Sequence, residues 1–178
     1  ERMGNFTTPQ AAAGLKLQRG TILLRIGRWD DAERAFAGGD ALFPGYWQIE
    51  QNRAQMAALR GDINGAIRLY RTAIAHGGAP ETMDALAALY RAQGDHAQAD
   101  ALSRQAAHLW DARLKAFPEA AQAHALDHYL AFGPTARTLR LALAGFHARP
   151  HGASAIALGW ALLANRRADD ALRIAQAG

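Results

Sequence analysis

The sequence predicts an all-α fold made of about five helical hairpins that follow one another along the chain. Glycines recur at near-constant spacing, and valine, a residue that favours strands, is absent from all 178 residues, while alanine is the commonest of the apolar residues that make up 50% of the chain. A period of about 34 residues is typical of stacked helical hairpins. The recurring glycines, which show this period, are Gly27, Gly61, Gly94 and Gly133.

Glycine and proline breakers divide the chain into a lead-in of residues 1–12 and a repeat region of residues 13–178. The first helix is expected to begin at Pro9, behind a capping residue. The last unit has Arg166 in place of the bend glycine and stops inside its second helix, so we expect the chain to be a piece of a longer protein. The five expected units are residues 13–46, 47–79, 80–118, 119–151 and 152–178.

The interval from Gly94 to Gly133 is longer than the other intervals by about six residues. The simplest place for the extra residues is one long second helix in the third unit, running from about residue 96 to residue 116. We expect the large aromatic side chains to pack between helices. These are Trp29, Phe36, Phe43, Tyr46, Trp47, Trp110, Phe117, Tyr129 and Phe132.

The motif residues of the hairpins resemble the tetratricopeptide repeat (TPR) family, in particular its bacterial type. Its pattern is W-x2-L-G-x2-Y, then A-x3-F, then P. The first unit matches it at Gly20, Leu23, Gly27, Ala32, Phe36 and Pro44; the second at Ala54, Ala57, Gly61, Ala66, Tyr70 and Ala73; the third at Leu86, Ala87, Tyr90, Gly94, Ala99 and Ala106. The fourth unit departs from it, with Leu126 and Thr138 where the family has small residues. The resemblance implies a right-handed superhelical solenoid.

The same resemblance implies a function: a non-enzymatic protein–protein interaction scaffold that binds a peptide or a partner subunit on its concave face. In the family, the fifth, sixth and ninth positions of each first helix generally point into that groove, and Arg91 lies one turn further on. Amide side chains there could hydrogen-bond an extended peptide, and a tryptophan could anchor it. The expected partner-binding residues are Gln51, Asn52, Gln55, Asp84, Arg91, His124, Asp127 and Trp160.

One string in the sequence offers an alternative, a metal-dependent hydrolase. His124 and His128 are four residues apart, which places both rings on one helix face, and Asp127 completes an H-x-x-D-H pattern close to that of a class of zinc peptidases. A catalytic zinc site requires a third protein ligand and an open position. The repeat framework offers no obvious deep cleft for a scissile bond, so we expect no catalytic residues, no metal and no cofactor.

Charge and composition bear on the partner. The net charge is only +4, and no block of like charge or basic stripe indicates nucleic-acid binding, which makes an RNA-binding helical repeat the weaker alternative. No apolar run approaches the length of a membrane span. We expect a protein or peptide partner, no nucleic acid, and self-association through uncapped end repeats. The sequence is compatible with either the bacterial cytoplasm or the periplasm.

Overall fold

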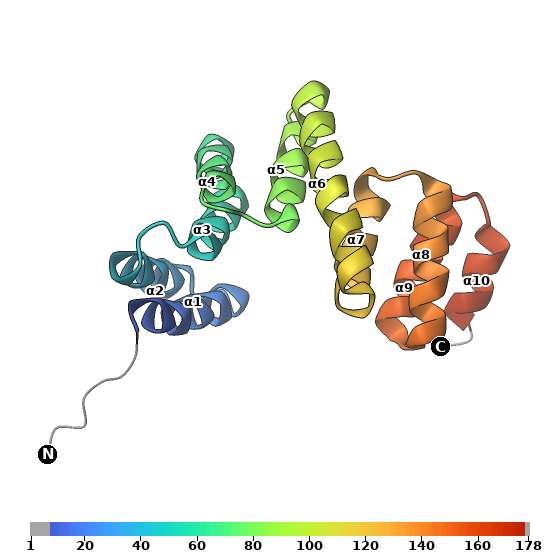
Figure 1. The fold of residues 1–178 in the computed structure, drawn as a ribbon, viewed down its shortest axis with the longest axis horizontal. Helices are drawn as coiled ribbons and strands as arrows, with labels where there is room; N and C mark the ends of the chain where they lie inside the picture. The colour runs from blue at the N-terminus through green and yellow to red at the C-terminus, as the bar shows by residue number, and fades with distance from the viewer. Residues whose placement is uncertain (1–7, 177–178) are drawn as a thin grey trace, which may run out of the picture. The chain divides into compact units, whose positions relative to one another are not determined.

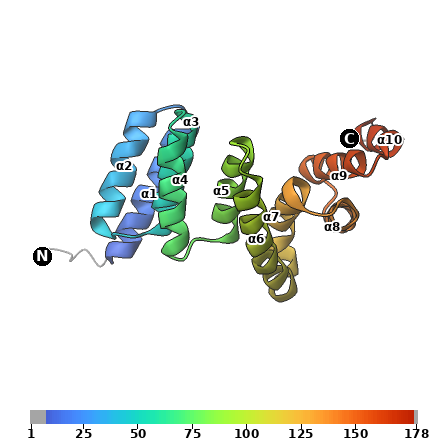
Figure 2. The same ribbon diagram turned by 90° about the horizontal axis from the view of Figure 1, so that it is seen from above.

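The computed structural model describes residues 8–176, and this part of the chain consists of ten α-helices without a strand (Figures 1 and 2). The first five helices are α1 (Pro9–Arg25), α2 (Trp29–Leu42), α3 (Trp47–Leu59), α4 (Ile63–Ala75) and α5 (Pro80–Ala92). The other five are α6 (His96–Ala116), α7 (Pro118–Phe132), α8 (Thr135–Ala148), α9 (Gly152–Ala164) and α10 (Ala168–Gln176). The predicted all-α class is confirmed.

Two helix boundaries follow the predictions closely. Helix α1 begins at Pro9, and the Thr8 side chain caps it by accepting a hydrogen bond of 3.2 Å from the Ala11 backbone N–H. Helix α6 is the predicted long helix and runs from His96 to Ala116. Residues 1–7 of the expected lead-in lie outside the described residues.

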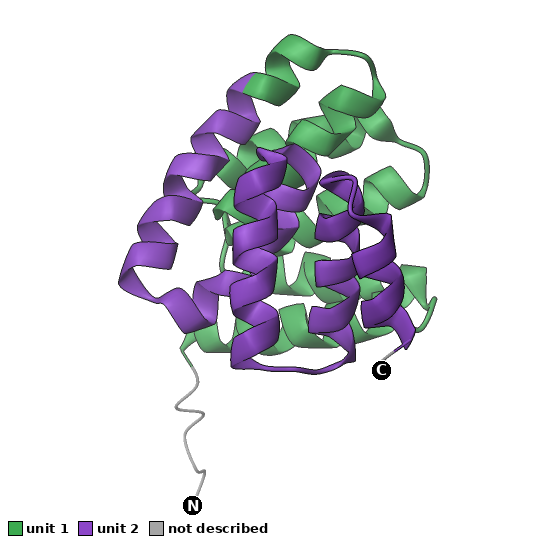
Figure 3. Ribbon diagram, turned by 90° about the vertical axis from the view of Figure 1, so that its right-hand side faces the viewer, with its two compact units in different colours: residues 1–100 green, residues 101–178 purple. Residues whose placement is uncertain are grey.

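The chain divides into two compact units, residues 1–100 and residues 101–178, with the boundary inside α6 (Figure 3). Unit 1 contains the antiparallel hairpins α1–α2 and α3–α4, and α3 packs on both helices of the first hairpin. In unit 2, α7 packs on α8, α9 packs on α10, and the two pairs meet mainly through α8 and α9. No helix in the described part of the chain is long and apolar enough to cross a membrane.

Each unit has its own core, and both cores rely on alanine at helix crossings. In unit 1, Phe36 of α2 is fully buried with Ile49 and Met56 of α3. In unit 2, Ala142 of α8 and Ala161 of α9 are buried in one cluster, and these two helices pack on each other. Small residues let helix backbones approach, and the larger neighbours fill the space between them.

The bends between paired helices lie at the predicted positions, but they differ in residue type and in backbone conformation. Gly27, Gly61 and Gly94 have φ values of 77°, 84° and 80°, in the left-handed region that ends many helices. Arg166 occupies the corresponding bend of the last hairpin with φ 60°, the one positive φ outside glycine in residues 8–176. Gly133 instead has an extended conformation with φ −91° and ψ 169°.

The expectation that the aromatic residues pack in the core is wrong for two of them. Phe117 is 68% exposed and Phe43 is 36% exposed. Both residues flank helices: Phe43 caps the end of α2 and Phe117 the start of α7. Spacing along a helix predicts which helix face is buried. Neither ring lies on such a face, so spacing could not show that the two rings are exposed. Phe36, Trp110 and Tyr129 are buried as predicted.

Candidate functional site

The candidate site in unit 1 is a row of polar side chains on α1, α3 and α5. Thr21 of α1 donates a hydrogen bond of 3.0 Å to the backbone carbonyl of Leu17 and lies 3.3 Å from the Asn52 Oδ1 acceptor on α3. The Asn52 amide nitrogen donates to the Gln48 carbonyl at 2.8 Å. Asn52 therefore ties α3 to α1, and both ends of its amide are engaged.

A second bond continues the row on the other side of α3. The Thr82 hydroxyl of α5 donates to Gln51 Oε1 at 2.5 Å, and Thr82 is fully buried. Because Gln51 and Asn52 point to opposite neighbours, α3 is held between α1 and α5 by one side-chain bond on each side. Sequence reasoning assigned these two amides to a ligand, and the structure gives them a structural role as well.

The other predicted residues of unit 1 differ in exposure. Gln55 lies one turn beyond Gln51 and Asn52 on α3, is exposed, and makes no hydrogen bond within the described residues. Asp84 is half-buried on α5, and Arg91 is exposed near the end of the same helix. Gln55 is thus the predicted amide that is free to meet a ligand.

In unit 2, the two histidines of the predicted metal string lie in different surroundings. His124 is exposed, and its ring stacks on Trp110 of α6 at 6.3 Å between centroids. His128 is buried with its ring against Tyr129 and Phe132. Among the described residues, no group of three or more His, Asp, Glu or Cys side chains could hold a metal ion. The arrangement does not favour the hydrolase alternative.

Asp127 lies between these histidines in the sequence, on the solvent side of α7. Although the residue as a whole is exposed, partial desolvation raises the pKa of its carboxyl above the ordinary value, and the charge of His124 acts in the opposite direction. The carboxylate of this exposed residue can accept hydrogen bonds from a polar ligand on this face.

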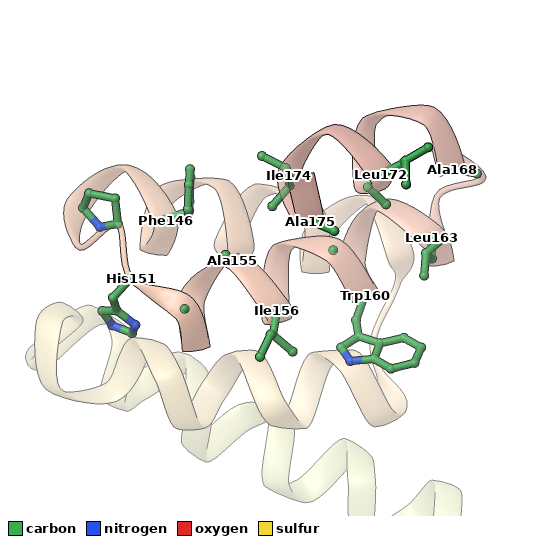
Figure 4. A pocket seen from close by; sticks show the side chains of 14 residues that line it. Phe146, His151, Ala155, Ile156, Trp160, Leu163, Ala168, Leu172, Ile174 and Ala175 are labelled. Atoms are coloured by element: carbon green, nitrogen blue, oxygen red, sulfur yellow. The ribbon is translucent and has the colours of Figure 1, made fainter. Parts of the chain in front are cut away.

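Trp160, the last predicted residue, lines an apolar groove that we call the α9–α10 groove. The groove has a volume of about 920 Å³ and is lined by side chains of α9, α10 and the end of α8. Figure 4 shows Ile156 and Trp160 on the same side of α9, with Leu172, Ile174 and Ala175 on α10. The exposed fractions of Trp160 and Leu172 are 62% and 57%. The groove thus brings exposed apolar side chains of two helices together.

Sequence reasoning named Trp160 as a contact residue and did not predict the groove around it. The signal was present in the small residues of α10: Ala168 and Ala175 occupy the positions that Trp29 and Phe36 hold in α2, counted from the bend residues Arg166 and Gly27. A repeat that loses its large residues at these positions leaves space between its two helices.

Comparison with known proteins identifies the fold. No protein-family model matches the sequence, and no curated protein matches it either. Among solved structures, PilF from Pseudomonas aeruginosa is similar with a TM-score of 0.66 and 15% identity, over 96% of this chain and 78% of that chain. A kinesin light chain from Podosopora anserina with TPR-like repeats has a TM-score of 0.61 and 16% identity, over 94% and 93%.

YrrB, described as a TPR protein with an unusual peptide-binding site, has a TM-score of 0.50 and 12% identity over 89% of this chain and 80% of that chain. At these identities the likeness concerns the fold, and the bacterial subtype of the family stays a prediction. The fold agrees with the motif residues quoted above. The chain therefore has the architecture of a tetratricopeptide-like repeat protein.

Proposed function

We propose that this protein is a non-enzymatic interaction scaffold that binds an extended peptide segment of a partner protein on the face formed by the first helices of its hairpins. The observation that carries the proposal is the row of side-chain bonds across α1, α3 and α5. These bonds fix the three helices in register, and Gln55 remains exposed beside them. A face that is rigid before binding loses little entropy on binding.

The fold supports the same conclusion by analogy. YrrB shares this repeat fold and is described as having a peptide-binding site. Amide side chains such as Gln55 offer both donors and an acceptor, which suits the alternating N–H and C=O groups of an extended peptide. His124 and Asp127 of α7 and Trp160 of α9 are the corresponding predicted contacts in unit 2.

The charge balance of unit 1 indicates how salt would affect the binding of a peptide. Residues 1–100 contain eleven Lys and Arg and eleven Asp and Glu residues, so the region has no net charge. Binding there would depend on hydrogen bonds and shape more than on long-range charge. We expect the affinity of a bound peptide to change by less than about threefold when the salt concentration rises from 0.05 to 0.5 M.

A peptide-display selection against the intact chain tests the proposal. Peptides selected on the native protein should bind the Gln55→Arg variant at least about tenfold more weakly, because the larger charged group occupies the docking face. The matched control is Gln98→Arg, the same change at an exposed glutamine of α6. Titration calorimetry measures both affinities. Equal affinity of the native protein and Gln55→Arg would place the peptide elsewhere and refute the assignment of this face.

A further inference from the structure

Side-chain bonds join neighbouring first helices at some repeat positions and not at others. Thr21 is the sixth residue before its bend residue Gly27, and Asn52 is the ninth residue before its bend residue Gly61. The Thr21 hydroxyl of α1 lies 3.3 Å from the Asn52 side-chain oxygen of α3. The sixth position before a bend therefore faces the ninth position before the next bend.

The same pair of positions lacks a bond in two later places. Gln55 of α3 corresponds to Thr21, and the residue that faces it on α5 is Ala85. Asp127 of α7 also corresponds to Thr21, and the residue that faces it on α9 is Ala157. An alanine side chain has no hydrogen-bonding group, so it cannot bond either residue. Gln55 and Asp127 are both exposed, and neither has a side-chain partner within the described chain.

The burial of α7 agrees with this register, although its bend residue Gly133 has an extended backbone. Leu126 and Tyr129 are 6% and 3% exposed, and they correspond to two buried positions of α1. Ala157 of α9 packs against the buried cluster that contains Leu126. Asp127 follows Leu126 in the sequence, so its carboxyl lies at the edge of this cluster, beside a small residue.

Asp127 is also the unpaired formal charge on the first helices of unit 2. Residues 101–178 contain nine Lys and Arg and five Asp and Glu residues, yet α7 and α9 contain none of the nine. The other acid of these two helices, Glu119, pairs with Arg149 at 3.6 Å. Partial desolvation raises the pKa of the Asp127 carboxyl, and within the described chain only the charge of His124 offsets this effect. A carboxylate that has lost hydration without gaining a partner is stabilised by a cation.

We infer that Asp127 binds a basic side chain, of lysine or arginine, in the partner peptide. This assignment rests on the proposed function, since it requires a peptide that lies along the first helices. It adds the charge of one peptide residue and the position on the protein where that residue binds. Gln55 has the equivalent position in unit 1 and carries no charge, so it would contact an uncharged polar group of the peptide.

The chain holds its own arginines with a carboxylate and a planar ring in the same way. Arg60 pairs with Asp30 at 3.1 Å, and its guanidinium carbon lies 5.7 Å from the centroid of the Trp29 ring. The same arrangement recurs in unit 2 with Arg137, Asp111 and Tyr129. On α7, Asp127 and the exposed His124 ring one turn earlier offer the same two kinds of group without an arginine.

Peptide display on the intact chain, with a library randomised at every position, tests the inference. Peptides selected on the native protein should carry Lys or Arg at one fixed position. Peptides selected on Asp127→Lys should carry Asp or Glu there instead, because the charge that faces the peptide is reversed. The matched control is Asp169→Asn, a change at an exposed acid of α10, which should select the same peptides as the native protein.

A double-mutant cycle then measures the pair itself. Replacing the basic residue of a selected peptide by glutamine should weaken its binding to the native protein about three- to fivefold, as expected for a solvent-exposed ion pair. The same replacement should leave the affinity for Asp127→Asn almost unchanged, because the carboxylate is already absent. Titration calorimetry measures the four affinities. Asp127 is exposed, so its replacement should not unfold the protein.

The outcomes distinguish this assignment from the proposed function. Selected peptides that bind Gln55→Arg more weakly but carry no fixed basic residue would overturn the assignment and leave the proposed function standing. Equal losses in the two halves of the cycle, or altered selection on Asp169→Asn, would overturn it as well. A charge preference that reverses on Asp127→Lys, with unchanged binding to Gln55→Arg, would support the assignment and refute the face proposed in unit 1. A chain on which no peptide can be selected would refute both.

Discussion

The first and last hairpins share a bend with positive φ and a network of two arginines around one aspartate, Asp31 or Asp170, yet they pack differently. In α1–α2, the Phe36 ring fills the space over Gly20 and is fully buried. In α9–α10, Ala175 takes the place of Phe36, the space over Gly159 is empty, and an apolar groove results. The two hairpins therefore keep the same local hydrogen bonds and ion pairs. They differ in whether a large side chain of the second helix fills the space between the two helices.

The largest expected effect comes from removing the ring that closes the first hairpin. Phe36→Ala should destabilise α1–α2 by about 3–5 kcal/mol, because it removes a fully buried ring and leaves a cavity. Hydrogen exchange measured by mass spectrometry reports it as loss of protection in the peptides of α1 and α2. Ala175→Phe at the equivalent exposed position of α10 should instead leave protection unchanged or increase it. Similar losses at both positions would show that the two hairpins do not differ as described.

A smaller effect is expected from the glycines that face these two positions. A side-chain carbon at residue 20 would lie within 3.0 Å of three carbons of the fully buried Phe36 ring. Gly20→Ala should therefore cost about 1–3 kcal/mol. Gly159→Ala meets nothing within 4 Å and should stabilise α9 by about 0.5–1 kcal/mol through its helix propensity. Urea denaturation of both variants measures the opposite signs, and equal signs would contradict the comparison.

The parts of the fold that depend on local rules could be predicted from the sequence. The period of the bend glycines located the hairpins, and Pro9 and the extra residues before Gly133 located the start of α1 and the length of α6. The exposure of Phe117 could not be predicted, because spacing specifies a helix face and this ring lies at a helix start, outside any face.

The candidate site was predicted only in part, because register gives the direction of a side chain and does not identify its bonding partner. Asn52 and Gln51 were expected to meet a ligand, and their bonds to Thr21 and Thr82 became visible only with the helices in place. The α9–α10 groove depends on what is missing from α10. A search for motif residues detects the large side chains that are present. It does not detect an alanine at a position where another repeat has phenylalanine.

The bend residues offer a third pair of changes, with effects near 1 kcal/mol. Gly27 and Arg166 both have positive φ, which costs a residue with a side chain about 1–2 kcal/mol. Gly27→Ala should destabilise the first hairpin by about this amount, since nothing within 4 Å of the new carbon compensates or adds to the cost. Arg166→Gly should stabilise the last hairpin by up to about 1 kcal/mol, because the relief of strain exceeds the added freedom of the unfolded chain. Thermal unfolding of the two single variants measures both signs.

The smallest expected effect concerns Asp31 and Asp170, where the two hairpins are alike. Hydrogen bonds from Arg28 and Arg34 lower the pKa of Asp31 despite some desolvation, and those from Arg167 and Arg173 do the same for Asp170. A carboxyl with a lowered folded pKa stabilises the protein at pH values above the unfolded pKa, near 3.8, and this contribution is lost as the pH falls through the folded pKa. Asp31→Asn and Asp170→Asn should therefore weaken their hairpins slightly at pH 7, and this loss should shrink as the pH falls through the folded pKa of each carboxyl. Carboxyl titration by NMR should place both pKa values below 3.8; a value above it at either residue would show that the shared RxDDAxR sequence does not form the same network in the open hairpin as in the closed one.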